Sequence, residues 1–355
     1  THTVFASANQ QVVGLGLLKV TDKRFSEAEY VGGDALAGLR NRTEKPWFAW
    51  VHLYDAHDPY RPPEPFATKY ASAPYRGEVA FVDAQVGALL DGLRDLGELD
   101  ETWVVIVADH GESLGEHGEE HHGVLLYDGA IHVPFLVRPP ASAGWKPAQV
   151  DVPVSLVDVA PTILDAVGLP HEGMDGRSLV PWLAGVTGES RTVYAESQYA
   201  WRHFGWAPQR AWIGPEWTLL DSTTPELYRA GERVDDAAKV ESLRGELDAF
   251  IAGLAPGLTA EKAPSSATER LEALGYLTGT SDAGRDANGA PLAGLPDPVQ
   301  RLPVLAKFEK ARAAYRAGDL ATARSTADEA VAADPGLVET RMLLAAIAWR
   351  SGDAD

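Results

Sequence analysis

Residues 103–111 read WVVIVADHG, a short apolar run that ends at Asp109-His110-Gly111. The run does not alternate between apolar and polar residues, which indicates a strand buried on both faces. Similar runs occupy residues 47–53 and 133–137, and apolar residues keep helical spacing over residues 78–96. These patterns predict an α/β fold in which helices cover a parallel or mixed sheet.

The composition narrows the class of protein. The 355 residues carry a formal net charge of −20 and include no cysteine. Disulfide bonds, thiolate zinc sites and cysteine nucleophiles are therefore excluded within these residues. The acidic balance argues against a nucleic-acid partner, and no apolar run reaches the roughly 18 residues that a membrane span needs. Because the first residue is Thr1 rather than Met, we expect a cut or processed N-terminus.

The C-terminal region is predicted to be helical. Residues 278–300 have the Gly, Ser, Asp and Pro content of a linker, and an Ala-rich region follows at residues 301–355. Five of its positions recur 34 residues later: Ala311, Ala314, Tyr315, Gly318 and Asp319 return as Ala345, Ala348, Trp349, Gly352 and Asp353. This period resembles a tetratricopeptide repeat (TPR), truncated at residue 355, and a generic helical hairpin is the alternative.

Histidines crowd into one part of the chain. Seven of the ten lie between residues 52 and 132: His52, His57, His110, His117, His121, His122 and His132. Asp109 and His110 follow a predicted strand and offer one hard oxygen and one borderline nitrogen ligand, which suits a divalent cation. Glu112 and Glu116 are expected in the first turn of a helix. Taken alone, Asp-His-Gly is also compatible with a capped loop.

Longer stretches around these histidines carry a family resemblance. Residues 50–60 read WVHLYDAHDPY, and residues 107–118 read VADHGESLGEHG. The further matching stretches are residues 122–123, 127, 133–135, 156–165 and 175–179. In this order they closely resemble the sulfatase family of the alkaline-phosphatase superfamily, over about residues 25–277.

The resemblance implies a domain organisation. Residues 1–185 would be the C-terminal portion of a sulfatase-like catalytic domain, a mixed sheet flanked by helices whose N-terminal part is missing. Residues 186–277 would form a small α+β subdomain. The linker at residues 278–300 and the TPR-like tail at residues 301–355 would follow.

The resemblance also implies roles for individual side chains. Asp109 and His110 look like ligands of one divalent cation, calcium by resemblance, and His57 looks like the acid that protonates the leaving group. His122 stands where many relatives place a lysine that contacts the leaving oxygen, and a catalytic role is expected for it. His203 is a candidate substrate contact. For His52, His117, His121 and His132 we favour packing, second-layer or structural roles.

The resemblance also implies a nucleophile and two or more further metal carboxylates upstream of the histidine loop, and these residues do not supply them. The family uses a cysteine oxidised to formylglycine, or a serine, in a Cys/Ser-x-Pro-x-Arg context upstream of the histidine loop. Ser72-Ala73-Pro74-Tyr75-Arg76 fits the bare pattern but follows that loop, so we interpret it as a chance match. We therefore expect the nucleophile in a segment outside these residues, and we expect the isolated chain to bind metal weakly without measurable turnover.

Three functions are compatible with these features. The leading prediction is a metal-dependent hydrolase of sulfate esters that acts on a small molecule or a sugar. The alternative in the same superfamily is a phosphoester or phosphonate hydrolase, for which manganese or another transition metal would be favoured. A different class is a non-catalytic protein that presents the TPR-like tail to a protein partner. A periplasmic or secreted location would agree with the family, and the sequence itself leaves the compartment open.

Overall fold

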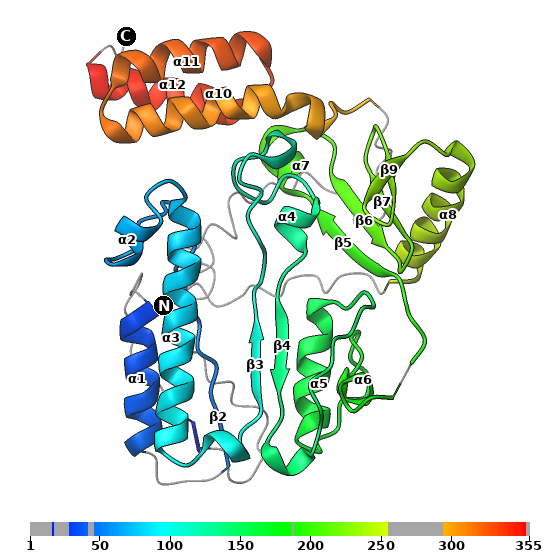
Figure 1. Cartoon of the computed structure of the whole chain (residues 1–355). Coiled ribbons are helices and arrows are strands. Elements are labelled where there is room, and N and C mark those ends of the chain that lie inside the picture. The colour runs from blue at the N-terminus through cyan, green and yellow to red at the C-terminus, as the bar shows by residue number, and fades with distance from the viewer. Residues whose placement is uncertain (1–15, 18–27, 42–45, 187, 255–293, 353–355) are drawn as a thin grey trace. The chain divides into compact units, whose positions relative to one another are not determined.

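The computed structural model describes residues 16–17, 28–41, 46–186, 188–254 and 294–352 (Figure 1). The chain divides into two compact units. The first unit consists of residues 1–105 and 137–145, and the second consists of residues 106–136 and 146–355. No helix in the described part of the chain is long and apolar enough to cross a membrane.

The first unit is built around two helices. Its elements are β1 (Gly16–Leu17), α1 (Ala28–Asn41), β2 (Trp47–Phe48), α2 (Phe66–Lys69) and α3 (Pro74–Asp95). Helices α1 and α3 pack together, and Leu39, Leu93 and Leu99 form a buried cluster between α1, α3 and the turn that follows. The helix predicted over residues 78–96 is thus confirmed as most of α3.

Two predictions for this unit are corrected or explained by the structure. The run at residues 47–53 is a strand only at Trp47 and Phe48, because the described part of β1 pairs with these two residues alone. Trp50 is 54% exposed, so the remainder of the run is not a buried strand.

The Pro of the Ser72-x-Pro-x-Arg pattern occupies the start of α3, where proline needs no hydrogen-bond partner, and Ser72 is exposed.

Strand β3 (Val104–Val107) pairs with β4 (Phe135–Arg138) in a two-stranded sheet, so both predicted strands are present. Their predicted burial on both faces is wrong, because none of their residues is fully buried. The boundary between the two units crosses both strands. A larger mixed sheet is not seen among the described residues, since the two small sheets β1–β2 and β3–β4 are separate there. The residues after β3 belong to the second unit, where they form the loop that carries Asp109, His110 and His122.

The second unit combines an antiparallel sheet with helices. Its elements are α4 (Asp128–Ile131), α5 (Val159–Ala166), α6 (Val180–Leu183), β5 (Val193–Ser197), α7 (Tyr199–Phe204), β6 (Gln209–Ile213), β7 (Trp217–Asp221), β8 (Glu226–Arg229), β9 (Glu232–Val234), α8 (Ala237–Gly253), α10 (Pro298–Ala317), α11 (Leu320–Ala333) and α12 (Val338–Ser351). The five strands lie in chain order, and every neighbouring pair is antiparallel. Helix α5 directly follows a 3₁₀ turn at Leu156–Asp158.

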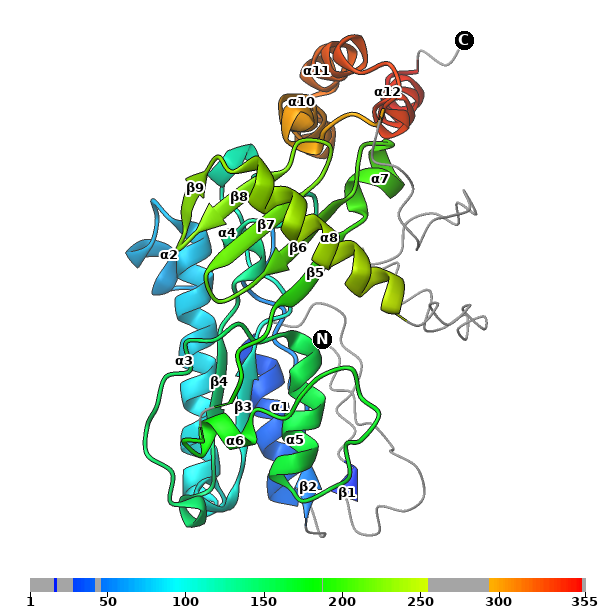
Figure 2. The ribbon, with the colours of Figure 1, turned by 90° about the vertical axis from the view of Figure 1, so that its right-hand side faces the viewer.

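Alternating side chains bury both faces of the five-stranded sheet. On one face, Trp212 and Leu219 pack against Leu243 and Leu247 of α8, which crosses the sheet (Figure 2). On the other face, Ala211 and Leu220 join a cluster that includes residues 124–127. The sheet thereby supports the loop that follows β3.

The C-terminal helices α10, α11 and α12 pack side by side (Figures 1 and 2). Helix α10 begins at Pro298, inside the range 278–300 that was expected to be linker, and Asp297 caps it by accepting the N–H of Val299 at 2.9 Å. Gly318 and Gly352 end α10 and α12 in the left-handed conformation, at φ 83° and 77°. The helical prediction is confirmed here, whereas its TPR identity stays a prediction. Residues 278–293 of the expected linker lie outside the described residues.

Asp221 provides a stability test of the second unit. Its fully buried carboxylate accepts hydrogen bonds from Arg210 and, at 2.6 and 2.8 Å, from Arg244. Asp221→Asn leaves two guanidinium groups poorly compensated, so we expect the free energy of unfolding to fall by about 3–5 kcal/mol in urea titrations followed by tryptophan fluorescence. The control is Asp248→Asn, whose 58% exposed side chain also pairs with Arg210 and should cost about 0–1 kcal/mol. Equal losses in the two variants would contradict this prediction.

Candidate metal centre

The loop after β3 starts with a close approach between two stretches of backbone. Gly111 donates its N–H to the Ala130 carbonyl at 2.7 Å. A Cβ atom at position 111 would collide with the Gly129 carbonyl oxygen, so only glycine fits there. Asp109 and His110 are thereby held next to the start of α4.

The loop then folds back on itself around a buried carboxylate. Ser113 donates its N–H to the His121 carbonyl at 2.8 Å. Glu119, only 3% exposed, accepts the N–H groups of Val124 at 2.8 Å and Leu125 at 3.1 Å. Burial raises the pKa of Glu119, although these two hydrogen bonds oppose the rise. The fold-back returns His122 to the neighbourhood of His110.

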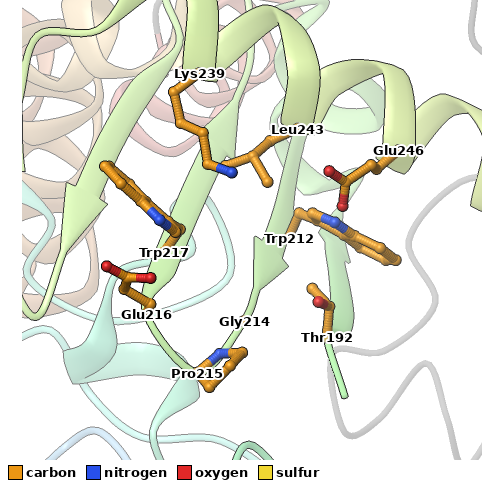
Figure 3. A pocket seen from close by; sticks show the side chains of 9 residues that line it. All are labelled: Thr192, Trp212, Gly214, Pro215, Glu216, Trp217, Lys239, Leu243 and Glu246. Carbon is orange, nitrogen blue, oxygen red and sulfur yellow. The ribbon is translucent and has the colours of Figure 1, made fainter. Parts of the chain in front are cut away.

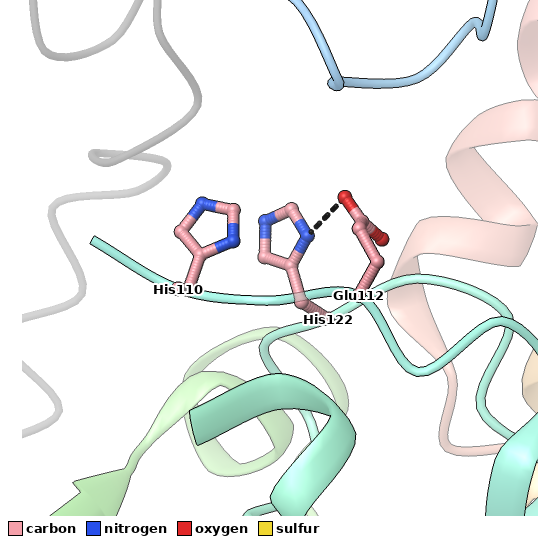
Figure 4. A group of neighbouring side chains, drawn as sticks. All are labelled: His110, Glu112 and His122. Atoms are coloured by element: carbon pink, nitrogen blue, oxygen red, sulfur yellow. Dashed lines mark hydrogen bonds and ion pairs between the residues drawn. The ribbon is translucent and has the colours of Figure 1, made fainter. Parts of the chain in front are cut away.

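Three side chains meet where the loop closes (Figure 4). His110, Glu112 and His122 each offer one ligand atom, and these atoms all lie within 4.8 Å of one another. His122 Nδ1 lies 3.0 Å from Glu112 Oε1, and the imidazoles of His110 and His122 stack with centroids 3.7 Å apart. Two imidazoles and a carboxylate form a donor set that suits a divalent transition metal.

The electrostatics around His122 are dominated by carboxylates. Burial lowers the pKa of His122, but the hydrogen bond to Glu112 and the negative charges nearby raise it by more. Those charges belong to Glu112, Glu119 and Asp109. The net effect is a pKa above the ordinary value for histidine, so a cation at this centre would compete with a proton on His122.

Asp109 and His110 are oriented by local contacts. Asp109 Oδ1 accepts the backbone N–H of His110 at 3.0 Å, and Asp109 Oδ2 lies 3.8 Å from His110 Nε2. His110 Nδ1 lies 3.0 Å from the Gly111 carbonyl, which favours a proton on Nδ1 and a lone pair on Nε2. The buried carboxylate of Glu112 beside two imidazoles, with Asp109 adjacent, therefore fits the divalent cation that the sequence predicts.

The structure revises one part of the predicted site. It brings His110 and His122 together, with Asp109 adjacent, and it adds Glu112, which was expected to serve the first turn of a helix. That expectation is wrong: among the described residues of this loop, the only helical turn is the 3₁₀ turn at Glu116–Gly118. The sequence feature that could have indicated Glu112 as a ligand is its position only two residues after His110, on the same loop.

His57 belongs to the first unit and is held within its own loop. Its Nδ1 lies 2.7 Å from the Asp58 carbonyl and 3.1 Å from the Tyr54 hydroxyl, and the Tyr54 ring stacks on it at 4.6 Å. Glu78 of α3, 6% exposed, fixes the loop backbone by accepting the N–H of Ala56 at 3.0 Å and that of Arg61 at 2.5 Å. Burial raises the pKa of Glu78. No motif in the sequence indicated this supporting role of Glu78.

His203 lies on α7 and contacts the C-terminal helices. Its Nδ1 is 3.8 Å from Glu339 Oε1 of α12, and its ring lies 4.1 Å from that of Tyr199. Burial, together with the charge of Arg202, lowers the pKa of His203. A substrate contact by His203 stays a prediction.

A separate cavity of about 210 Å³ lies between the five-stranded sheet and α8 (Figure 3). The indoles of Trp212 and Trp217 line it, together with Glu216, Lys239 and Glu246. The Lys239 ammonium lies 5.4 Å from the centre of the Trp217 ring, a cation–π distance. None of the predicted site residues lines this cavity, so it is distinct from the loop after β3.

Known sulfatases resemble this chain in sequence over the part that carries the candidate metal centre. Residues 29–169 match the sequence model of the sulfatase family. Arylsulfatase K of Danio rerio is 36% identical over 130 residues, 35% of this chain and 24% of the relative. The uncharacterized sulfatase YidJ of Escherichia coli is 25% identical over 270 residues, 62% of this chain and 52% of the relative. The chain thus spans from a quarter to about half the length of these relatives.

A solved structure supports the fold. The phosphonate monoester hydrolase SpPMH from Silicibacter pomeroyi superposes with a TM-score of 0.55 at 22% identity, over 66% of this chain and 62% of the hydrolase. The described α/β elements therefore share the fold of this hydrolase. Residues 29–169 thus match the sulfatase family model, and the sequence relatives are sulfatases by name.

Proposed function

We propose that the natural protein that carries this sequence hydrolyses sulfate esters with the help of one divalent cation. The observation that carries the proposal is the convergence of His110, Glu112 and His122 on a loop inside the segment that matches the sulfatase family. A small aryl sulfate or a sulfated sugar is the substrate class that fits this proposal, because the sequence relatives are named as sulfatases.

Each side chain has a stated role in the proposal. Asp109, His110, Glu112 and His122 would hold the cation, which would neutralise charge on the non-bridging oxygens of the ester. His57 would protonate the leaving oxygen, a contribution of about 10²–10⁴-fold in rate. Its contacts through Nδ1 to Asp58 and Tyr54 orient the ring for proton transfer at Nε2. No residue of this chain is assigned as the nucleophile, for which the resemblance implies formylglycine or serine.

The donor set favours a transition metal over calcium. Calcium takes six to eight oxygen ligands, whereas the ligands proposed from this chain are two imidazoles and two carboxylates. Imidazole nitrogen suits manganese, zinc and similar ions. We therefore replace the calcium expected from the family by a transition metal in this proposal.

A phosphoester or phosphonate hydrolase is the second candidate. It is favoured by one observation: His122, which stands where many relatives have lysine, shares a hydrogen bond with Glu112 inside the donor cluster. In that position His122 would act as a metal ligand. No permanently charged lysine would then contact the leaving oxygen from position 122.

The two candidates can be separated with matched aryl sulfate and aryl phosphate monoesters. We expect a higher kcat/KM for the sulfate in the natural protein, and we expect a chelator to abolish turnover because the cation carries charge in the transition state. Readdition of manganese should restore the rate. Faster turnover of the phosphate would establish the second candidate, and hydrolysis unaffected by chelation would contradict both.

A further inference from the structure

The C-terminal helices are joined to the loop that carries the candidate metal centre. Leu302 of α10, 5% exposed, belongs to the same buried cluster as Val124 and Leu125, which lie two and three residues after His122. The side chain of Leu302 also covers the turn at Gly118, where an added Cβ would lie 3.3 Å from Leu302 Cδ1. The Leu302 side chain therefore lies against the turn before Glu119 and shares a buried cluster with residues that come after His122.

The start of α10 is itself fastened to the sheet subdomain. Ala207 donates its N–H to the Pro296 carbonyl at 2.9 Å. The Asp297 carboxylate accepts the Thr223 hydroxyl at 2.8 Å and the Thr224 N–H at 2.9 Å. Leu302 is therefore held against the loop by contacts that are independent of the loop.

We propose that Leu302 is a positioning residue for the metal centre, an inference that rests on the proposed function. Glu119 anchors the fold-back through the N–H groups of Val124 and Leu125, and Leu302 belongs to the same buried cluster as these residues. Removing the leucine side chain leaves a cavity into which the fold-back can relax, and His122 moves with it. Metal affinity depends on ligand atoms held within a few tenths of an ångström, so a small shift of His122 weakens the centre.

The test uses the whole 355-residue chain and Co²⁺ as the probe. The d–d absorption of bound Co²⁺ reports the number and geometry of its ligands, and it needs no turnover. In Leu302→Ala we expect a roughly tenfold higher Kd for Co²⁺ and an altered absorption spectrum. Leu302→Met, which refills the space, should restore both.

A matched control separates positioning from general stability. Ile347 of α12 is fully buried in a different cluster with Ala311, Ala323 and Ala327. Leu302→Ala and Ile347→Ala should each lower the Tm by roughly 5–15 °C, while Ile347→Ala should leave the Co²⁺ Kd and spectrum unchanged. If Leu302→Ala is too unstable to study, Leu302→Val should show a smaller change in the same direction.

The outcomes that overturn the inference differ from those that overturn the proposed function. Wild-type Co²⁺ affinity and spectrum in Leu302→Ala and Leu302→Val would overturn the positioning role while leaving the metal centre intact. An equal loss of Co²⁺ affinity in Ile347→Ala would mean that Leu302 contributes only to the stability of the fold and does not position the metal centre. Failure of the unchanged chain to bind Co²⁺ would overturn the metal centre itself.

Discussion

Glu112→Gln will weaken the binding of Mn²⁺ or Co²⁺ to the chain by about 10–100-fold or more. Glu112 is 8% exposed, and its carboxylate is the anionic member of the cluster with His110 and His122. Glutamine keeps the size of the side chain but removes the charge that compensates the cation. A neutral amide oxygen is also a weaker ligand for a transition metal.

Isothermal titration with Mn²⁺ would measure this loss. Glu120→Gln is the matched control, because Glu120 lies on the same loop with an exposed side chain and makes the same change in net charge. We expect it to bind the ion with nearly wild-type affinity. Unchanged binding in Glu112→Gln, or the same loss in both variants, would exclude Glu112 from the centre.

His57→Asn will lower kcat for an aryl sulfate with a poor leaving group by about 10²–10⁴-fold in the natural protein. The physical reason is that a poorly stabilised leaving oxygen must gain a proton as its bond to sulfur breaks. A nitrophenolate is already a good leaving group and needs little protonation. The loss should therefore shrink to about tenfold or less for nitrophenyl sulfate.

The dependence on the leaving group is the readout that identifies an acid. A plot of log kcat against the pKa of the leaving phenol should become steeper in His57→Asn than in the unchanged protein. His171→Asn makes the same chemical change at a histidine outside the motifs of the site and should leave the plot unchanged. A loss in His57→Asn that is the same for every leaving group would instead assign His57 to binding or orientation.

The local elements of the fold could be predicted because their patterns are local. The apolar run before Asp109 becomes β3, and the helical spacing over residues 78–96 becomes most of α3. The prediction of a strand over all of residues 47–53 is wrong for a non-local reason. A strand needs a partner, and the described part of β1 reaches only Trp47 and Phe48.

The donor cluster could be predicted only in part. His110 and His122 were expected near a metal or the reaction because their spacing resembles a known family. The loop, however, is closed by Glu119, whose hydrogen bonds to Val124 and Leu125 leave no periodic trace in the sequence. Glu112 was accordingly interpreted as a helix residue. The contact between Leu302 and Gly118 joins positions far apart in the chain, and no local pattern reports it.

The close approach of two backbone stretches at Gly111 limits which substitutions could change the ligands of this metal centre during evolution. An aspartate or glutamate at position 111 would place another carboxylate between His110 and Glu112, an apparent gain for a cation site. The Gly129 carbonyl blocks that route, because any side chain there must first push two stretches of backbone apart. Changes in metal or substrate preference must therefore arise at neighbouring positions that tolerate exchange.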